Sequence, residues 1–151
     1  MVRELAFQGA ADAEPHPDIL ATLRSQNLRA VVICPSNPFI SIEPILAVRG
    51  MRAALRDCSA PVLAVSPIIG GRAVKGPTAK MMAELGVAVT PAAVASRYAD
   101  LLDGYVVDHA DASSLGAITA RSFAAPILMQ SLADRERLAH IVLGAADELR
   151  R

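Results

Sequence analysis

The sequence predicts an α/β domain with a mostly parallel, Rossmann-like sheet flanked by helices. Short, continuous apolar runs recur at 31–34, 62–65, 105–107 and 126–129, and such runs are typical of strands that are covered on both faces. Segments with the apolar spacing of helices separate them, and strands that alternate with helices favour a parallel sheet. A length of 151 residues indicates one domain, 1–151.

Composition excludes several classes of function. Acidic and basic side chains balance at 15 each, so we expect no nucleic acid and no membrane surface among the partners. No apolar run approaches the roughly 20 residues that span a bilayer, and the start of the chain lacks the apolar core of a signal peptide. We therefore expect a cytoplasmic protein. The apolar fraction of 53% indicates a deeply buried sheet or a surface that further protein covers.

Two cysteines, Cys34 and Cys58, are too few for a disulfide framework. Three scattered histidines show no metal spacing. We expect small buried thiols in a reducing compartment.

The first part of the chain predicts three elements. A weak alternation at 2–7 favours a short strand. Pro17 and Asp18 suit the first turn of a helix, whose apolar stripe continues to Leu23. The first strong strand follows at 30–34.

The middle of the chain predicts helices around the second strand. A helical stretch at 45–56 is interrupted by Gly50, and the strand at 62–65 precedes a glycine-rich loop. A helix at 80–85 then ends at Gly86, because glycine readily takes the left-handed conformation that closes a helix.

Strong capping signals mark the last third. Thr90 and Pro91 start a helix whose apolar stripe runs from Val94 to Leu102. Gly104 ends it, and a strand follows at 105–107. An alanine-rich helix at 112–121 and a fourth strand at 126–129 follow. The last helix begins with Ser131, Asp134 completes its capping box, and its end places Asp147 four residues before Arg151, which suits an ion pair.

The loop after the first strand carries Ser36 and Asn37, with Pro38 fixing the next φ angle. In open α/β sheets the ligand crevice lies beyond the carboxyl ends of the strands. The asparagine amide offers a donor and an acceptor on one planar group, which suits a purine edge or an amide-like ring. Alternatively, both side chains only cap their own backbone.

The loop after the second strand contains Gly70, Gly71, Arg72, Lys75 and Gly76. Glycine lets backbone N–H groups approach an anion, and a lysine or arginine supplies charge, so the loop resembles a phosphate cradle in composition. It is neither a Walker A loop nor a dinucleotide fingerprint. A plain turn before the next helix explains the composition equally well.

A third polar stretch, Asp108–Asp111, follows the strand at 105–107. It suits either a general-base or metal cluster or, more simply, a capping aspartate beside a solvated His109. A serine-hydrolase elbow, G-x-S-x-G, does not occur in the sequence.

The loop motifs form an ordered set that closely resembles the C-terminal half of the 2-phospho-L-lactate transferase family of deazaflavin (coenzyme F-420) biosynthesis. The resemblance covers essentially all 151 residues, but only about half of the family protein. The motifs that carry it are Pro35-Ser36-Asn37-Pro38, Ser41-Ile42, Pro44-Ile45-Leu46, Ser66 to Gly71, Lys75-Gly76-Pro77, Tyr98 to Asp103, Asp108 to Asp111, Leu128-Met129 and Asp134-Arg135.

This resemblance implies a Rossmann-like core and a transfer reaction. A phospholactyl or phosphoenolpyruvyl group would move from a guanosine diphosphate donor to 8-hydroxy-5-deazariboflavin, with release of GMP and with magnesium as cofactor. The resemblance also implies that the phosphate loop, the metal-linked acidic residues and the main deazaflavin contacts lie in the N-terminal half. No catalytic residue and no metal ligand is therefore assigned to this sequence.

The resemblance carries over a set of substrate-binding positions, with Asn37 for polar recognition and Lys75 for phosphate charge. The full set is Ser36, Asn37, Ser41, Ser66, Gly70, Gly71, Lys75 and Gly76. Two alternatives stay open, a non-catalytic nucleotide- or flavin-binding module and a purely structural assembly domain. In each case we expect a homo-oligomer or association with a chain that supplies the N-terminal half.

Overall fold

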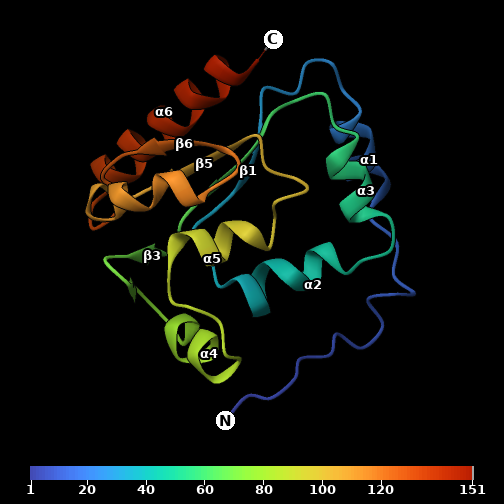
Figure 1. The fold of residues 1–151 in the computed structure, drawn as a ribbon. Helices are drawn as coiled ribbons and strands as arrows, with labels where there is room; N and C mark the ends of the chain where they lie inside the picture. The colour runs from blue at the N-terminus through green and yellow to red at the C-terminus, as the bar shows by residue number, and fades with distance from the viewer. Residues whose placement is uncertain (151) are drawn as a thin grey trace.

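The computed structural model describes residues 1–150 and confirms the α/β architecture (Figure 1). Four strands form one sheet in the order β1-β2-β5-β6, and all three pairings are parallel. Their bounds are β1 Val31–Ile33, β2 Val62–Val65, β5 Gly104–Val107 and β6 Arg121–Ala124.

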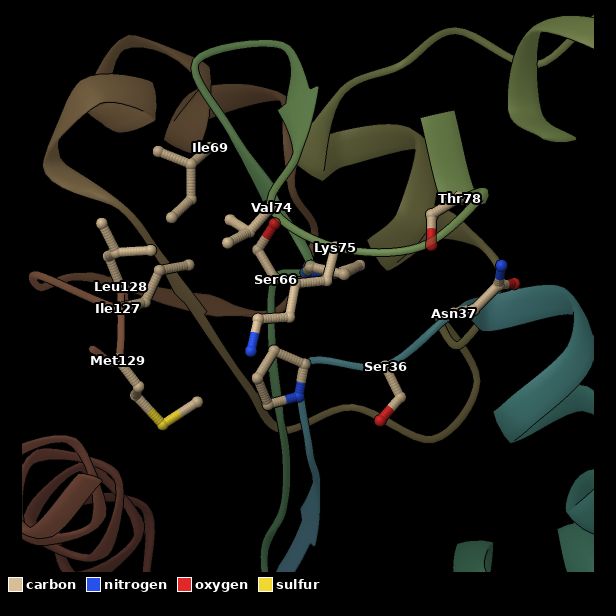
Figure 2. A pocket seen from close by; sticks show the side chains of 12 residues that line it. Ser36, Asn37, Ser66, Ile69, Val74, Lys75, Thr78, Ile127, Leu128 and Met129 are labelled. Atoms are coloured by element: carbon tan, nitrogen blue, oxygen red, sulfur yellow. The ribbon is translucent and has the colours of Figure 1, made fainter. Parts of the chain in front are cut away.

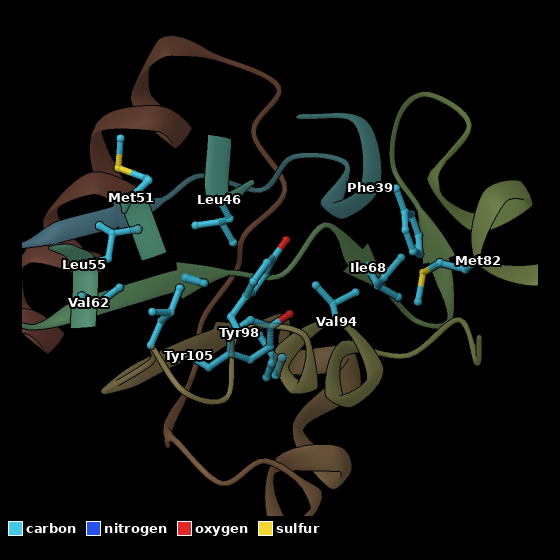
Figure 3. Close-up of a cluster of buried hydrophobic side chains, with 14 of the residues drawn as sticks. Phe39, Leu46, Met51, Leu55, Val62, Ile68, Met82, Val94, Tyr98 and Tyr105 are labelled. Carbon is cyan, nitrogen blue, oxygen red and sulfur yellow. The ribbon is translucent and has the colours of Figure 1, made fainter. Parts of the chain in front are cut away.

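Helices cover the two faces of the sheet unequally. Alternate side chains of the strands point to opposite faces. On one face Val62, Ala64 and Tyr105 pack in a large core with the first five helices. Figure 3 shows Val62 and Tyr105 in this core. On the other face a smaller core contains Leu63 and the last helix (Figure 1). The helices are α1 Pro17–Leu23, α2 Glu43–Leu46, α3 Met51–Arg56, α4 Thr78–Glu84, α5 Pro91–Ser96 and α6 Leu132–Leu149.

Four predicted signals for helix ends are confirmed, although α5 ends at Ser96, earlier than its predicted apolar stripe. Gly50 separates α2 from α3 with a φ of +83°. Gly86 ends α4 at φ +70°, and the next N–H, that of Val87, donates to Met82 O at 2.8 Å, the pattern of a Schellman motif. Thr90 caps α5, and the capping box at the start of α6 has both of its hydrogen bonds.

The predicted strand at 2–7 is wrong. This segment has no ladder partner, because the N–H of Val2 donates to the Glu84 carboxylate at 2.7 Å instead of a neighbouring strand. This hydrogen bond is the largest cause of the lowered pKa of Glu84.

The fourth strand also lies earlier than predicted, at 121–124 instead of 126–129. The N–H of Ala125 donates to the last carbonyl of β5, that of Val107. Pro126 cannot donate, and Asp108 accepts the N–H of Ile127 at 3.2 Å, so the apolar run continues as a loop. The helix predicted at 112–121 is a 3₁₀-helix at His109–Ala117.

The glycine-rich loop contains a hairpin that is not among the predicted elements. Strands β3 (Ile68–Ile69) and β4 (Arg72–Ala73) pair antiparallel. Gly70 and Gly71 connect them at φ +55° and +72°, the positive values that a two-residue hairpin turn of type I′ requires.

Edge positions differ from the expectation of uniform burial. Every residue of β2 and β5 is buried, whereas Val32 of β1 is 38% exposed. Cys34 is exposed rather than buried, because it follows the end of this edge strand, and Cys58 is half-buried. The predicted ion pair between Asp147 and Arg151 is not tested, because Arg151 lies outside the described residues. Asp147 forms an ion pair with Arg29.

Candidate ligand crevice

A crevice of about 140 Å³ opens at the carboxyl ends of the strands, where the sequence analysis expects one (Figure 2). It lies between the loop that follows β1, the hairpin loop that follows β2 and the segment that follows β6. The lining residues are Pro35, Ser36, Asn37, Ser66, Pro67, Ile69, Val74, Lys75, Thr78, Ile127, Leu128 and Met129.

The two sides of the crevice differ in chemistry. Ser36, Asn37 and Thr78 lie on one side, whereas the apolar run 127–129 lies on the other (Figure 2). The exposed Lys75 extends its ammonium group between them. Lys75 is the one ionisable side chain among the lining residues in the described part of the chain. Such an arrangement can hold a flat ring against the apolar side and an anionic group beside the ammonium.

Asn37 is largely engaged in its own loop. Its Oδ1 accepts the N–H groups of Phe39 and Ile40 at 2.9 and 3.3 Å, and its Nδ2 lies 3.4 Å from the sulfur of Met81. The carbonyl therefore caps the π-helical turn Pro38–Ile42. What remains for a ligand is one N–H of the amide, because an Asn carbonyl has two lone pairs.

Ser66 lines the crevice with a hydroxyl that is also satisfied internally. It donates to Ile68 O at 2.9 Å and lies 3.0 Å from the N–H of the same residue. Ser66 is 1% exposed. We infer that its main contribution is to hold the bend between β2 and the hairpin.

The glycines shape the loop without lining the crevice. The N–H of Gly70 donates to the carboxylate of Asp111 at 2.8 Å, which fixes the hairpin tip and occupies that donor. Gly76, at φ +69°, turns the chain between Lys75 and α4. Gly70, Gly71 and Gly76 thus place Lys75, and Ser41 lies exposed on the π-helical turn outside the lining.

The Asp108–Asp111 stretch adopts the capping arrangement. Asp108 accepts the N–H of Ala110 at 3.0 Å and that of Ile127 at 3.2 Å, while His109 is exposed. Within residues 1–150 no group of three or more His, Cys, Asp or Glu side chains could hold a metal ion. We therefore derive no step through a metal in this chain.

Two buried phenols lie in the core that Figure 3 shows, not in the crevice lining. Tyr98 and Tyr105 are 2% and 0% exposed. Their hydroxyls have no hydrogen-bond partner among residues 1–150. Burial raises the pKa of both groups, so they stay neutral at physiological pH.

The apolar side of the crevice was missed from the sequence. The apolar run at Ile127, Leu128 and Met129 predicts a buried strand, whereas Pro126 is a signal against a strand at this position. Nothing in the sequence predicts Val74 and Thr78 as lining residues, except that they lie within three residues of Lys75. Of the predicted positions, Ser36, Asn37, Ser66 and Lys75 lie together in the lining, and their ligand contacts stay predictions.

None of the helices formed by residues 1–150 has both the length and the apolar character needed to cross a membrane.

The fold and the crevice define a Rossmann-like α/β domain with a ligand crevice at the carboxyl ends of its strands. The chain belongs to the 2-phospho-L-lactate transferase CofD family, whose profile matches residues 1–140.

Curated relatives support this assignment. The phosphoenolpyruvate transferase of Kitasatospora aureofaciens is 39% identical over 146 residues, which cover 94% of this chain and 45% of the relative. That of Streptomyces coelicolor is 38% identical with the same coverage. That of Nocardia farcinica is 35% identical over 144 residues, 92% of this chain and 41% of the relative. The chain therefore spans about half the length of these relatives, as the resemblance to one half of the family protein implies.

Proposed function

We propose that this chain provides the donor side of a transferase site in coenzyme F-420 biosynthesis. The reaction moves a phospholactyl or phosphoenolpyruvyl group from a guanosine diphosphate donor to 8-hydroxy-5-deazariboflavin and releases GMP. The observation that carries the proposal is the crevice itself, in which Lys75 lies between a polar and an apolar side in a chain of this family.

The size of the crevice supports a shared site. Pockets that hold small molecules are typically about 300–1,000 Å³, whereas this crevice measures about 140 Å³. It has room for a ring or a phosphate group but not for a whole nucleotide and an acceptor. The rest of the site, with magnesium and the deazaflavin, belongs in this proposal to the part of the family protein that the chain does not span.

The chemistry needs no nucleophilic side chain from this half. The acceptor hydroxyl releases its proton to solvent as its oxygen forms the new bond to the phosphorus of the transferred group. The P–O bond between the two phosphates of the donor breaks, and GMP leaves with the electron pair. Phosphoryl-type transfers depend mainly on positioning and on neutralising charge. The Lys75 ammonium can neutralise a phosphate oxygen, and the apolar run 127–129 can orient a ring.

Calorimetry with GDP and GMP tests the donor side. We expect Lys75→Ala to weaken binding at least tenfold, because hydrogen bonds to a charged group contribute about 1.5–3 kcal/mol. Arg72→Ala is the matched control, since Arg72 is a cation in the same hairpin that does not line the crevice. Equal binding by Lys75→Ala and the parent chain would remove the proposal. Asn37→Ala is less informative, because it also removes the cap of the Pro38–Ile42 turn.

A second candidate is a nucleotide-binding or assembly module without catalysis. The observation that favours it is the lack, among residues 1–150, of a side-chain cluster suited to a metal. Turnover decides between the two candidates. The chain is mixed with a guanosine donor, magnesium and deazaflavin, with and without a chain that carries the other half. Product in the mixture that contains the other half supports the transferase, and binding without product in either mixture supports the module.

The proposal includes a cytoplasmic setting, where these soluble substrates would be available. It also includes association, either with a second copy of the chain or with a chain that carries the remaining half.

A further inference from the structure

In the described part of the chain, helix α6 covers one face of the sheet at its central strands, but strand β1 is uncovered on that face. Val32 and Leu63 are register partners and point to the same face of the sheet. Leu63 is 0% exposed beneath α6, whereas Val32 is 38% exposed. Parallel strands are almost always covered on both faces. Residues 1–150 therefore leave one strand of this face without its helix.

The outer edge of β1 is open as well. The N–H of Val31 donates to Pro61 O, toward β2. Neighbouring residues of a strand direct their backbone groups to opposite sides, so the N–H and C=O of Val32 point away from the sheet. Exposed edges are usually protected by charge. The other edge strand, β6, has Arg121 paired with Glu148 of α6 at 2.7 Å, whereas β1 reads Val-Val-Ile.

The flank of α6 next to β1 carries three apolar side chains. Arg150 donates to Leu28 O at 2.8 Å, which turns this flank toward the start of β1. At 100° per residue, Leu132, Ala139 and Leu143 lie on the same flank, within about 20° of Arg150. Leu132 is 68% exposed, Ala139 is exposed and Leu143 is half-buried. We infer that Val32 and these three side chains form an apolar strip between α6 and the edge of the sheet, bordered by the exposed Glu136.

The strand order indicates which further strand would complete the sheet. It runs β1-β2-β5-β6 in one direction, with α1 to α5 on one face. In doubly wound sheets the ligand crevice lies at the point where strand order reverses, and the helices of the second direction cover the opposite face. No reversal occurs among the strands of residues 1–150. A parallel strand added beside β1 would create one next to Ser36 and Asn37, which line the crevice.

We propose that the open edge of β1 and the strip formed by Val32, Leu132, Ala139 and Leu143 are the docking surface for the remaining half of the family protein. That half adds a parallel strand beside β1 and a helix over Val32, whether it lies on the same polypeptide or on another. The relatives provide the occupant's length, because this chain spans only 45% of the Streptomyces coelicolor protein. The inference rests on the shared site of the proposed function and specifies the surface that joins its two parts.

Co-expression tests the interface. The tagged part of the Streptomyces coelicolor relative outside the 146 matched residues is produced together with this chain, and co-purification is measured. We expect the parent chain to co-purify, Val32→Asp to lower recovery at least tenfold and Leu132→Asp to lower it less. Ile19→Asp is the matched control, because Ile19 is 46% exposed on α1, which packs with the other face. Circular dichroism of each purified variant checks that it is folded.

Thiol labelling adds a local measurement. Cys34 follows β1 two residues after Val32, so we expect the complex to slow its alkylation at least tenfold. Cys58, which packs against the other core, is the internal reference and should react at an unchanged rate.

Several outcomes would overturn the inference. They are failure of the parent chain to co-purify, equal loss with Ile19→Asp, unchanged recovery with Val32→Asp, and a homodimer of this chain that protects Cys34 by itself. A Val32-dependent complex without transfer would remove the proposed activity and leave the interface. Transfer catalysed by this chain alone would support the activity and remove the proposed interface.

Discussion

Val32 and Leu63 are neighbours in the same row of the sheet, yet their environments are opposite. The row runs Val32, Leu63, Gly104 and Arg121 across the four strands. In the centre, Leu63 is completely buried beneath α6, and at one end Val32 is 38% exposed. The centre of the sheet is covered on both faces. The β1 edge has the apolar composition of a central strand, but no helix among residues 1–150 covers its Val32 face.

The largest expected effect comes from the central residue of this row. Leu63→Ala should lower the free energy of unfolding by about 3 kcal/mol, because it leaves a cavity in a packed core. Val32→Ala, its register partner, should change stability by only about 0.5 kcal/mol. Urea denaturation of both variants measures the difference. Equal losses would show that the β1 face is already covered, and the comparison would fail.

Gly104 provides the second test, because it lets α6 approach the sheet. A Cβ added there would lie 2.8 Å from Leu149 Cδ1 and 3.1 Å from Leu63 Cδ2. The leucine of α6 can move in part, but the buried Leu63 cannot move freely. We expect Gly104→Ala to cost about 1–3 kcal/mol, measured by thermal unfolding. A neutral result would mean that α6 is loosely packed over the centre as well.

The same contrast explains what the sequence could predict. Helix ends were predictable from local chemistry, since Gly50, Gly86, Thr90 and Ser131 each act through their own backbone or hydroxyl. Strands buried on both faces were predictable from continuous apolar runs. The run 126–129 was not, because periodicity does not show where the neighbouring strand β5 ends.

The candidate site shows a similar limit. The loops that follow β1 and β2 were predictable, because strand ends are visible in the sequence and four of the eight predicted positions line the crevice. Which groups were already engaged was not predictable. The capping bonds of Asn37 and the contact between Gly70 and Asp111 depend on tertiary placement. The openness of Val32 was hidden for the same reason, since a buried strand and an uncovered one have the same composition.

A smaller effect is expected at the start of α6, the single helix that packs on the Leu63 face within the described chain. Ser131→Ala removes the N-cap hydroxyl, which accepts the N–H of Asp134, and should cost about 1 kcal/mol. A matched Ser96→Ala, at the end of α5 where no N-cap is lost, should be nearly neutral. Equal unfolding midpoints for the two variants would contradict the role of the cap.

This cap also makes stability dependent on pH. Arg137 and then Ser131 hold the pKa of Asp134 below its usual range by hydrogen bonding to the carboxylate. A lowered folded-state pKa stabilises the protein above the unfolded value of about 3.9, and that contribution is lost as pH falls toward the folded value. We expect Asp134→Asn to weaken the dependence of the melting temperature on pH below about 4. An unchanged slope would exclude this carboxylate as a cause.

The smallest effect has the opposite sign and distinguishes the two sides of α6. Gly144 lies exposed within the helix, and a Cβ there would meet no atom within 4 Å. Alanine is favoured over glycine in a helix by up to about 1 kcal/mol, so Gly144→Ala should raise the melting temperature by about 2–4 °C. The same substitution at Gly104 should lower it, because there the new methyl group meets Leu63. If Gly144→Ala instead destabilised the chain, the outer side of α6 would be a contact surface, and the open region of this domain would extend beyond β1.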